Sequence, residues 1–169
     1  AVPEFYEGVN PGTVPNTDRL LRSVREYLVN NKDVILIDRV AYNAFLEASG
    51  IMKTDKKKYK LLPEIMYRFV SINYTDNGRD LIKFIIKQNP DLETDIYILE
   101  HYPFWNMIGY SAKICYKDVV LAHIIHYSNR CTPIKMVDGL QIGSFDFTLM
   151  MNMAFAFYNR VNNNSDASH

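Results

Sequence analysis

The stretch from Thr94 to Tyr127 is the most strand-like part of the chain, because it consists of apolar runs divided by short polar breaks. The runs are rich in the β-branched and aromatic residues that suit a pleated, half-buried surface. Pro103 separates the first two runs, since proline cannot donate to a central strand ladder, and Lys117-Asp118 is short enough for a tight hairpin turn. We therefore expect an antiparallel meander of three strands. The expected strands are Thr94–His101, Met107–Tyr116 and Val119–Tyr127.

Before the meander, apolar residues recur every three or four positions in three segments, which is the pattern of a helix with one buried face. Two strands are expected between these segments. The first is a short continuous apolar run, which is typical of a fully buried strand. In the second, apolar and polar residues alternate imperfectly, so we expect it near the centre of the sheet. The expected helices are Asp18–Asn30, Arg39–Ala48 and Tyr74–Asn89, and the expected strands are Val34–Ile37 and Glu64–Ile72.

After the meander, the chain predicts a short strand, Ile134–Val137, and a turn at Asp138-Gly139. A final helix, Phe145–Val161, follows with Ser144 as its cap. This helix is apolar on almost every side, which is typical of a helix that is buried all round. Two interpretations stay open: part of the helix meets another domain or subunit, or the helix simply packs in the core. Its narrow polar line consists of Thr148, Asn152 and Asn159.

The order of these elements predicts an α+β fold, in which helices flank one mixed, largely antiparallel sheet. We expect a single domain over residues 16–161. Residues 1–15 contain three prolines and two glycines, which predicts an extended arm or linker. The polar residues 162–169 predict a disordered tail.

The charge of the chain narrows the classes of function. Its 169 residues are enough for one domain with a core, and 48% hydrophobic and 22% charged residues are ordinary for a globular protein. The net charge is zero, whereas a free-standing nucleic-acid binder usually carries a basic excess. The charge therefore does not support such a binder, although it leaves a local basic patch open.

Cysteine usage and hydropathy bear on location. Cys115 and Cys131 are too few for a disulfide framework, so we expect two reduced thiols in an intracellular protein. No apolar stretch reaches the roughly 20 residues that a membrane span requires. The N-terminal residues have no apolar signal region. We therefore expect a cytoplasmic protein without a membrane partner.

A lysine-rich segment, Met52–Lys60, has five lysines in nine residues. Lysine is a mobile point charge that suits contact with a phosphate backbone. The alternative is a solvated surface loop, which is the more common setting for such a charge run. The candidate RNA-binding residues are Lys53, Lys56, Lys57, Lys58 and Lys60.

Tyr102, Phe104 and Trp105 surround Pro103. Aromatic residues that flank a proline are often exposed enough to bind a base or a partner, so this trio is a candidate stacking or docking surface. The alternative is that the three side chains belong to the core.

Candidate catalytic chemistry is limited to one acidic pair. Two-metal phosphoryl transfer needs two carboxylates at positions i and i+2 on one strand face. Glu93 and Asp95 have this spacing at the start of an expected strand. They are weak catalytic candidates, and an active transferase that used them would require magnesium and ATP. The alternative is that the two carboxylates are simply solvated at the start of a strand.

Histidines do not predict a metal site. His123 and His126 lie three apart in an expected strand, so they point to opposite faces and cannot share a metal. None of the four histidines has a cysteine or carboxylate at metal-ligand spacing. If the chain is not an active transferase, we expect it to bind neither a metal nor another cofactor.

Several short motifs follow one another along the chain. They are Val34-Ile35-Leu36-Ile37 with Ala41-Tyr42-Asn43, His101-Tyr102-Pro103-Phe104-Trp105, Gly109-Tyr110, Tyr116-Lys117-Asp118, Asn129-Arg130-Cys131-Thr132-Pro133 and Ile142-Gly143-Ser144-Phe145-Asp146. No single motif is specific. Their order, over roughly residues 33–161, resembles part of the poly(A) polymerase catalytic subunit of large DNA viruses, a family that includes poxvirus-like and giant-virus enzymes.

The resemblance implies a nucleotidyltransferase-like fold, a small mixed sheet flanked by helices. Active members of that superfamily have a Gly-Gly or Gly-Ser turn after the first strand and Asp-x-Asp on the next strand, which holds two magnesium ions. Here the corresponding turn is Asp38-Arg39, and the next strand reads Glu64-Ile65-Met66-Tyr67. Gly143-Ser144 comes too late in the chain to serve. The chain therefore resembles an inert nucleotidyltransferase-like region of such enzymes better than a catalytic one.

Two hypotheses of different class follow. The first is a domain of a viral-type polyadenylation enzyme that is non-catalytic alone and supports RNA binding or contacts another polymerase domain or subunit, which implies location in a viral factory. The second is a viral structural or assembly protein that forms an oligomer or particle. The proline-rich arm and the apolar last helix are compatible with an oligomer.

Overall fold

A computed structural model of the protein describes residues 14–37, 39–49, 66–101, 110–127, 134–151 and 153. Most of the predicted arm and all of the predicted tail lie outside these ranges. None of the helices within the described ranges is long and apolar enough to cross a lipid bilayer.

The described strands form one seven-stranded sheet, in the order β3-β4-β5-β2-β1-β7-β6. β2 lies at its centre, as its apolar sequence predicts, and every residue of β2 is buried. In chain order the strands are β1 Val34–Ile37, β2 Tyr67–Ser71, β3 Ile96–His101, β4 Ser111–Tyr116, β5 Val119–His126, β6 Ile134–Val137 and β7 Leu140–Gly143.

Strand pairing makes the sheet mixed. The predicted meander is confirmed, because β3, β4 and β5 pair antiparallel in sequence order. β1 and β2 are also antiparallel, as are β6 and β7. Two pairs are parallel, β2 with β5 and β1 with β7. The predicted α+β fold with a mixed, largely antiparallel sheet is therefore confirmed.

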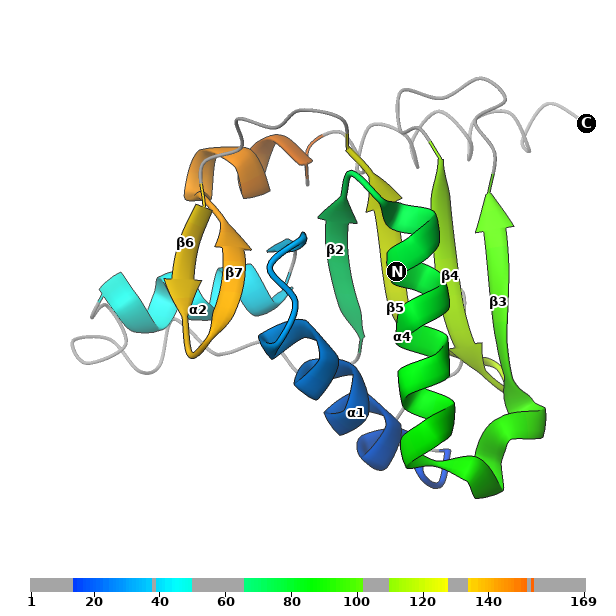
Figure 1. The fold of residues 1–169 in the computed structure, drawn as a ribbon. Coiled ribbons are helices and arrows are strands. Elements are labelled where there is room, and N and C mark those ends of the chain that lie inside the picture. Colours follow the sequence, from blue (N-terminus) through cyan, green and yellow to red (C-terminus); the bar gives the residue numbers. More distant parts are fainter. Residues whose placement is uncertain are drawn as a thin grey trace, which may run out of the picture.

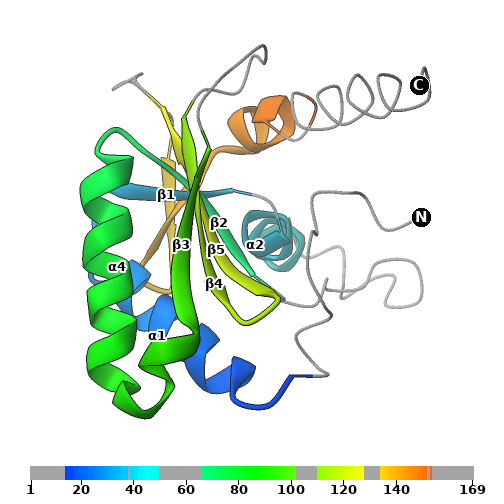
Figure 2. The ribbon, with the colours of Figure 1, turned by 90° about the vertical axis from the view of Figure 1, so that its right-hand side faces the viewer.

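Helices cover both faces of this sheet (Figures 1 and 2). α1 (Thr17–Val29) and α4 (Tyr74–Gln88) lie on one face, and α2 (Arg39–Ser49) lies on the other. A further helix, described at residues 145–151 and 153 and here named the C-terminal helix, shares the face of α2. Ser144 caps it as predicted, since its Oγ accepts the Phe147 N–H at 3.3 Å.

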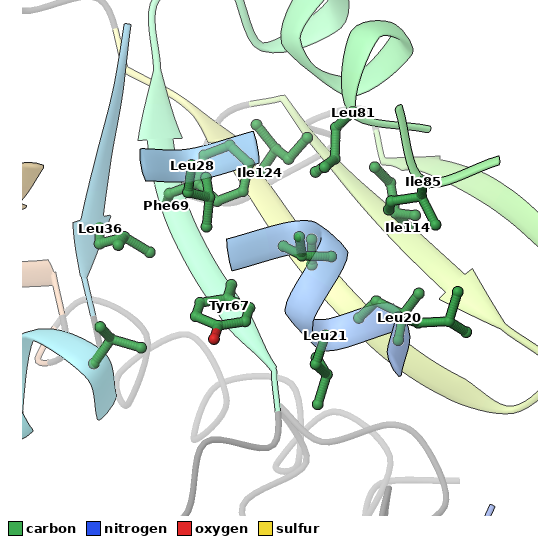
Figure 3. Close-up of a cluster of buried hydrophobic side chains, with 14 of the residues drawn as sticks. Leu20, Leu21, Leu28, Leu36, Tyr67, Phe69, Leu81, Ile85, Ile114 and Ile124 are labelled. Atoms are coloured by element: carbon green, nitrogen blue, oxygen red, sulfur yellow. The ribbon is translucent and has the colours of Figure 1, made fainter. Parts of the chain in front are cut away.

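The larger core lies between the sheet and the α1–α4 pair (Figure 3). Leu20 and Leu28 of α1, Leu81 and Ile85 of α4 and Phe69 of β2 belong to this one cluster, in which Leu28 lies beside Phe69 and Ile85 lies beside Ile114, and all five are at most 1% exposed. Complete burial of one such side chain stabilises the fold by about 1.5–3 kcal/mol. A smaller cluster on the opposite face joins the sheet to the C-terminal helix through Ile37, Val70, Ile125, Phe147 and Met151.

One local prediction was wrong, and one strand was missed. The 3-10 helix η2 (Pro90–Asp95) stands where the first residues of a strand were expected, so β3 begins only at Ile96. Proline fits the first turn of a helix, where its missing N–H has no partner to lose. Strand β7 was not predicted, because its four residues between a turn and a helix cap are too few to show a period of two.

Candidate functional site

A row of basic side chains crosses the middle of the sheet from β2 to β4. Arg68 of β2 pairs in register with Ile37, the last residue of β1, and with His123 of β5. His123 in turn pairs with Lys113 of β4. Residues directly opposite each other on neighbouring strands point to the same face. Because Ile37 belongs to the cluster beneath the C-terminal helix, the row lies on that face.

Arg68 and His123 form a buried hydrogen bond. Arg68 Nε donates to His123 Nδ1 at 3.1 Å, and the two residues are only 4% and 7% exposed. Since arginine stays protonated in proteins, the imidazole nitrogen must be the acceptor. His123 is therefore a neutral imidazole in this arrangement, with its proton on Nε2.

The same strand lacks the groups that magnesium needs. β2 reads Tyr67, Arg68, Phe69, Val70 and Ser71, with no carboxylate at any position. Magnesium prefers oxygen ligands, and a nearby guanidinium repels it. In the described part of the chain, no three His, Cys, Asp or Glu side chains are grouped so that they could hold a metal ion. The described residues of this strand therefore offer no carboxylate to a metal ion, and Glu64, just before them, lies outside the described ranges.

Glu93 and Asp95 do not have the placement that was predicted for them. Both lie in η2 rather than in a strand, and both are exposed. The rule that residues i and i+2 share a face holds for strands, so it does not bring these two carboxylates together. The predicted strand geometry is wrong, and a catalytic role for the pair stays a prediction.

The remaining candidate residues fall outside the described ranges. These are the five lysines at positions 53, 56, 57, 58 and 60 and the aromatic trio Tyr102, Phe104 and Trp105. For the histidines, the prediction of opposite faces is confirmed. His123 contacts Arg68, whereas the ring of His126 lies 5.5 Å from the ring of Tyr74 on α4.

A pocket of about 430 Å³ opens beside the carboxyl end of β2. This volume lies in the range of small-molecule sites. Its lining mixes apolar side chains with one basic and one acidic residue. The lining residues are Lys32, Asp33, Ile35, Val70, Ser71, Ile72, Asn73, Tyr127, Ile134 and Gln141. Sequence reasoning missed this pocket, because segments far apart in the chain form it and none carries a motif.

A polar network fixes the wall of this pocket. The Asp33 N–H donates to Asn31 Oδ1 at 2.9 Å, which leaves the Asn31 amide nitrogen to donate to Asn77 Oδ1 at 3.3 Å. Asn77 Nδ2 then donates to Ser71 Oγ, which also accepts the Asn73 N–H at 3.0 Å. The amide oxygens of Asn31 and Asn77 each accept one of these hydrogen bonds, so the amide nitrogen of the same side chain must donate the next one. The end of α1, the end of β2 and the start of α4 are therefore held together.

Cys115 is an inert thiol rather than a nucleophile. Burial raises its pKa above the ordinary thiol value, and nearby Lys113 offsets this only in part. A reactive cysteine needs a lowered pKa and access to solvent. Cys115 is 3% exposed and does not meet either condition.

Comparison with solved structures identifies the fold. The chain is similar to the Megavirus polyadenylate synthase with a TM-score of 0.67 and 21% identity, over 86% of this chain and 31% of that one. It thus spans about a third of the Megavirus protein, and the predicted nucleotidyltransferase-like fold is confirmed. A protein from H. pylori described as a nucleotidyltransferase matches at a TM-score of 0.37 and 12% identity, over 79% of this chain and 54% of that one, which does not establish a shared fold. No protein-family model and no curated protein matches the sequence.

Proposed function

We propose that this chain is a nucleotidyltransferase-like domain that does not itself transfer nucleotides and that supports RNA binding in a polyadenylation enzyme of viral type. One observation carries the non-catalytic part of the proposal. Arg68, which is hydrogen-bonded to His123 of the neighbouring strand β5, lies on β2, the strand that the resemblance assigns to the two magnesium ions. The similarity of fold to the Megavirus polyadenylate synthase supports the enzyme class.

The non-catalytic role is tested by incubating the chain with an RNA primer, ATP and magnesium. We expect no extension of the primer at any enzyme concentration. Extension that disappears in a Glu93→Ala, Asp95→Ala double variant would overturn the proposal and assign catalysis to the acidic pair. A double variant of two exposed carboxylates elsewhere, Glu47→Ala with Asp80→Ala, controls for the equal change in net charge.

RNA binding is tested by titration with single-stranded RNA at low and physiological salt. We expect salt-sensitive binding that is lost when the lysines at positions 53, 56, 57, 58 and 60 become glutamine, because each phosphate contact contributes a slope of about −0.7 in log K against log salt. The matched control changes five exposed lysines elsewhere and alters the net charge equally. These are Lys32, Lys83, Lys87, Lys117 and Lys135. Equal loss in both variants would reject the lysine segment as the RNA site.

An assembly protein is the second candidate function, and exposed apolar side chains favour it. Large apolar residues that stay half exposed usually mark a contact with another molecule when they gather on one patch. Such a patch lies on β6 and the C-terminal helix. This candidate requires an oligomer or a particle, so a sedimentation boundary that contains monomer alone would reject it.

A further inference from the structure

The pocket beside the carboxyl end of β2 is separate from the hydrogen bond between Arg68 and His123. Ser71, the last residue of β2, lines this pocket. Arg68 lies three residues earlier, which corresponds to about 10 Å at a rise of about 3.3 Å per residue. The pocket therefore lies toward the other end of the strand, beside the start of α4 (Figure 1), and we name it the β2 pocket.

Ser71 has a hydroxyl proton that no described residue accepts. Its Oγ accepts hydrogen bonds from Asn77 Nδ2 and from the Asn73 N–H, so both lone pairs of the hydroxyl are used. The proton must then be donated elsewhere, and Ser71 is only 3% exposed. Because a buried donor without an acceptor destabilises a fold, this hydroxyl favours a bound molecule that offers an acceptor inside the β2 pocket.

Four further polar residues of the lining have groups to offer a ligand. Asn73 precedes α4 but makes no side-chain capping bond, so its amide is available. Gln141 donates one N–H to the Lys32 carbonyl at 2.8 Å, which leaves its Oε1 to accept. Within the described ranges no ion pair engages Lys32 or Asp33. The pocket thus holds donors, acceptors, a cation and a carboxylate that are not used by the fold.

The remaining walls of the β2 pocket are apolar, and one of them is aromatic. The ring of Tyr127 is held in place by Phe147, with 5.1 Å between the ring centroids. Ile72 and Ile134 line the same pocket and are 41% and 47% exposed. A ligand with a flat apolar surface would cover these side chains. The lining therefore suits a molecule that is apolar on its faces and polar on its edges.

A pair of stacked tyrosines stands next to this pocket. The rings of Tyr74 and Tyr110 are nearly parallel, at 18° and 6.3 Å between centroids, and Tyr110 is 43% exposed. Tyr74 directly follows the pocket residue Asn73 in the chain. Aromatic side chains of this kind stack with the bases of single strands. A strand with one residue in the β2 pocket would thus meet an aromatic side chain beside it.

We propose that the β2 pocket binds one nucleotide unit. The base lies against Tyr127 and the apolar walls, and its polar edge meets the Ser71 hydroxyl and the amides of Asn73 and Gln141, since such groups pair with base edges. The ribose phosphate lies toward Lys32 and Asp33. A lysine suits a phosphate, and a carboxylate accepts from ribose hydroxyls in nucleotide sites. The volume of about 430 Å³ is in the lower range of small-molecule sites, as expected for one unit.

The nucleotide unit can be a free nucleotide or one residue of an RNA strand. The strand form rests on the proposed RNA binding, whereas the free form does not. A wholly apolar ligand is disfavoured, because it would leave the Ser71 proton and the charges of the pocket without partners. Lys32 adds at most one phosphate contact to RNA binding, against five from the lysine-rich segment, so the lysine exchange in the RNA titration stays informative.

The site is tested by calorimetric titration of the whole chain with AMP and with ribose 5-phosphate, which lacks the base. We expect one saturable site for AMP and binding of ribose 5-phosphate that is weaker by about tenfold or more, because the base contacts are missing. Asn73→Ala should weaken AMP binding about three- to tenfold without changing ribose 5-phosphate binding. Lys32→Ala should weaken both ligands, and the matched control is Lys83→Ala, an exposed lysine of α4 outside the pocket lining.

The outcomes separate this proposal from the proposed function. AMP that does not saturate the protein at millimolar concentration, equal affinity for the two ligands, or no loss in Asn73→Ala would overturn the pocket proposal, even where RNA still binds. Thermal unfolding of Asn73→Ala should match the parent, since no hydrogen bond of the described ranges uses that side chain. If AMP binds as expected, weaker RNA binding in Asn73→Ala assigns the pocket to a strand residue, and unchanged RNA binding assigns it to a free nucleotide.

Discussion

Arg68 Nε donates to His123 Nδ1 across two parallel strands, at 3.1 Å and shielded from solvent. The two residues are 55 positions apart in the chain. The bond joins β2 to β5 through a side-chain contact at the centre of the sheet, beside the last residue of β1. It places a buried cation on the central strand of the sheet.

Removal of either member of this pair should destabilise the protein. Arg68→Met leaves a buried imidazole nitrogen without its donor, which costs about 1–3 kcal/mol of unfolding free energy. His123→Phe removes the acceptor and leaves Arg68 with one partner fewer. Urea unfolding of both single variants and the double variant should give a coupling energy of about 1–3 kcal/mol. Strictly additive effects would show that the bond contributes nothing, and exposed Arg22→Met should stay within about 0.5 kcal/mol of the parent.

Asn89 holds the end of α4 to α1, and its loss should be costly. Its Nδ2 donates to Ser23 Oγ at 3.0 Å and to the Ile85 carbonyl at 2.9 Å, and the residue is 2% exposed. Asn89→Ala leaves these buried acceptors without a donor and should lower the unfolding free energy by about 1–3 kcal/mol. Asn30→Ala is the matched control, since exposed Asn30 makes one bond, to the Glu26 carbonyl at 3.0 Å. An equal loss in both variants would contradict this account.

Substitution by alanine should have opposite effects on stability at two glycines. A Cβ at Gly143 would stand 2.6 Å from Phe147 Cδ1, so the buried Phe147 ring or the helix that carries it would have to shift, and we expect a loss of about 1–3 kcal/mol. A Cβ at Gly78 meets its nearest neighbours at 3.4 Å, an ordinary contact. Gly78→Ala within α4 should therefore be neutral or stabilising by up to about 1 kcal/mol. Thermal unfolding of the two variants checks the contrast, and a stable Gly143→Ala protein would refute it.

Alkaline pH should destabilise the fold through Cys115. Its pKa is raised by burial, so between the thiol's unfolded and folded pKa values the folded state binds more protons than the unfolded state. The unfolding free energy must then fall as pH rises above about 8.5, the ordinary thiol pKa. In Cys115→Ala the unfolding free energy should fall less steeply with pH above about 8.5. Identical slopes in the two proteins, measured by urea unfolding between pH 7 and pH 10, would assign the effect to other groups.

The sequence by itself determined the helices and most strands, because their signals are local. A 3.6-residue period marks α1, α2 and α4, and the Lys117-Asp118 turn and the Ser144 cap are set by a few neighbouring residues. Even the central place of β2 could be predicted, since apolar and polar residues do not alternate regularly along it. The resemblance on ordered motifs also indicated the fold that the structural comparison confirmed.

Only the tertiary structure decided which strands are neighbours. The parallel pairing of β2 with β5 depends on closing a loop of about fifty residues and on burying both sheet faces together, and no local period encodes that balance. This pairing alone brings Arg68 beside His123. The pocket at the end of β2 and the open edge of β6 arise in the same way, because each is made of residues whose neighbours come from distant parts of the chain.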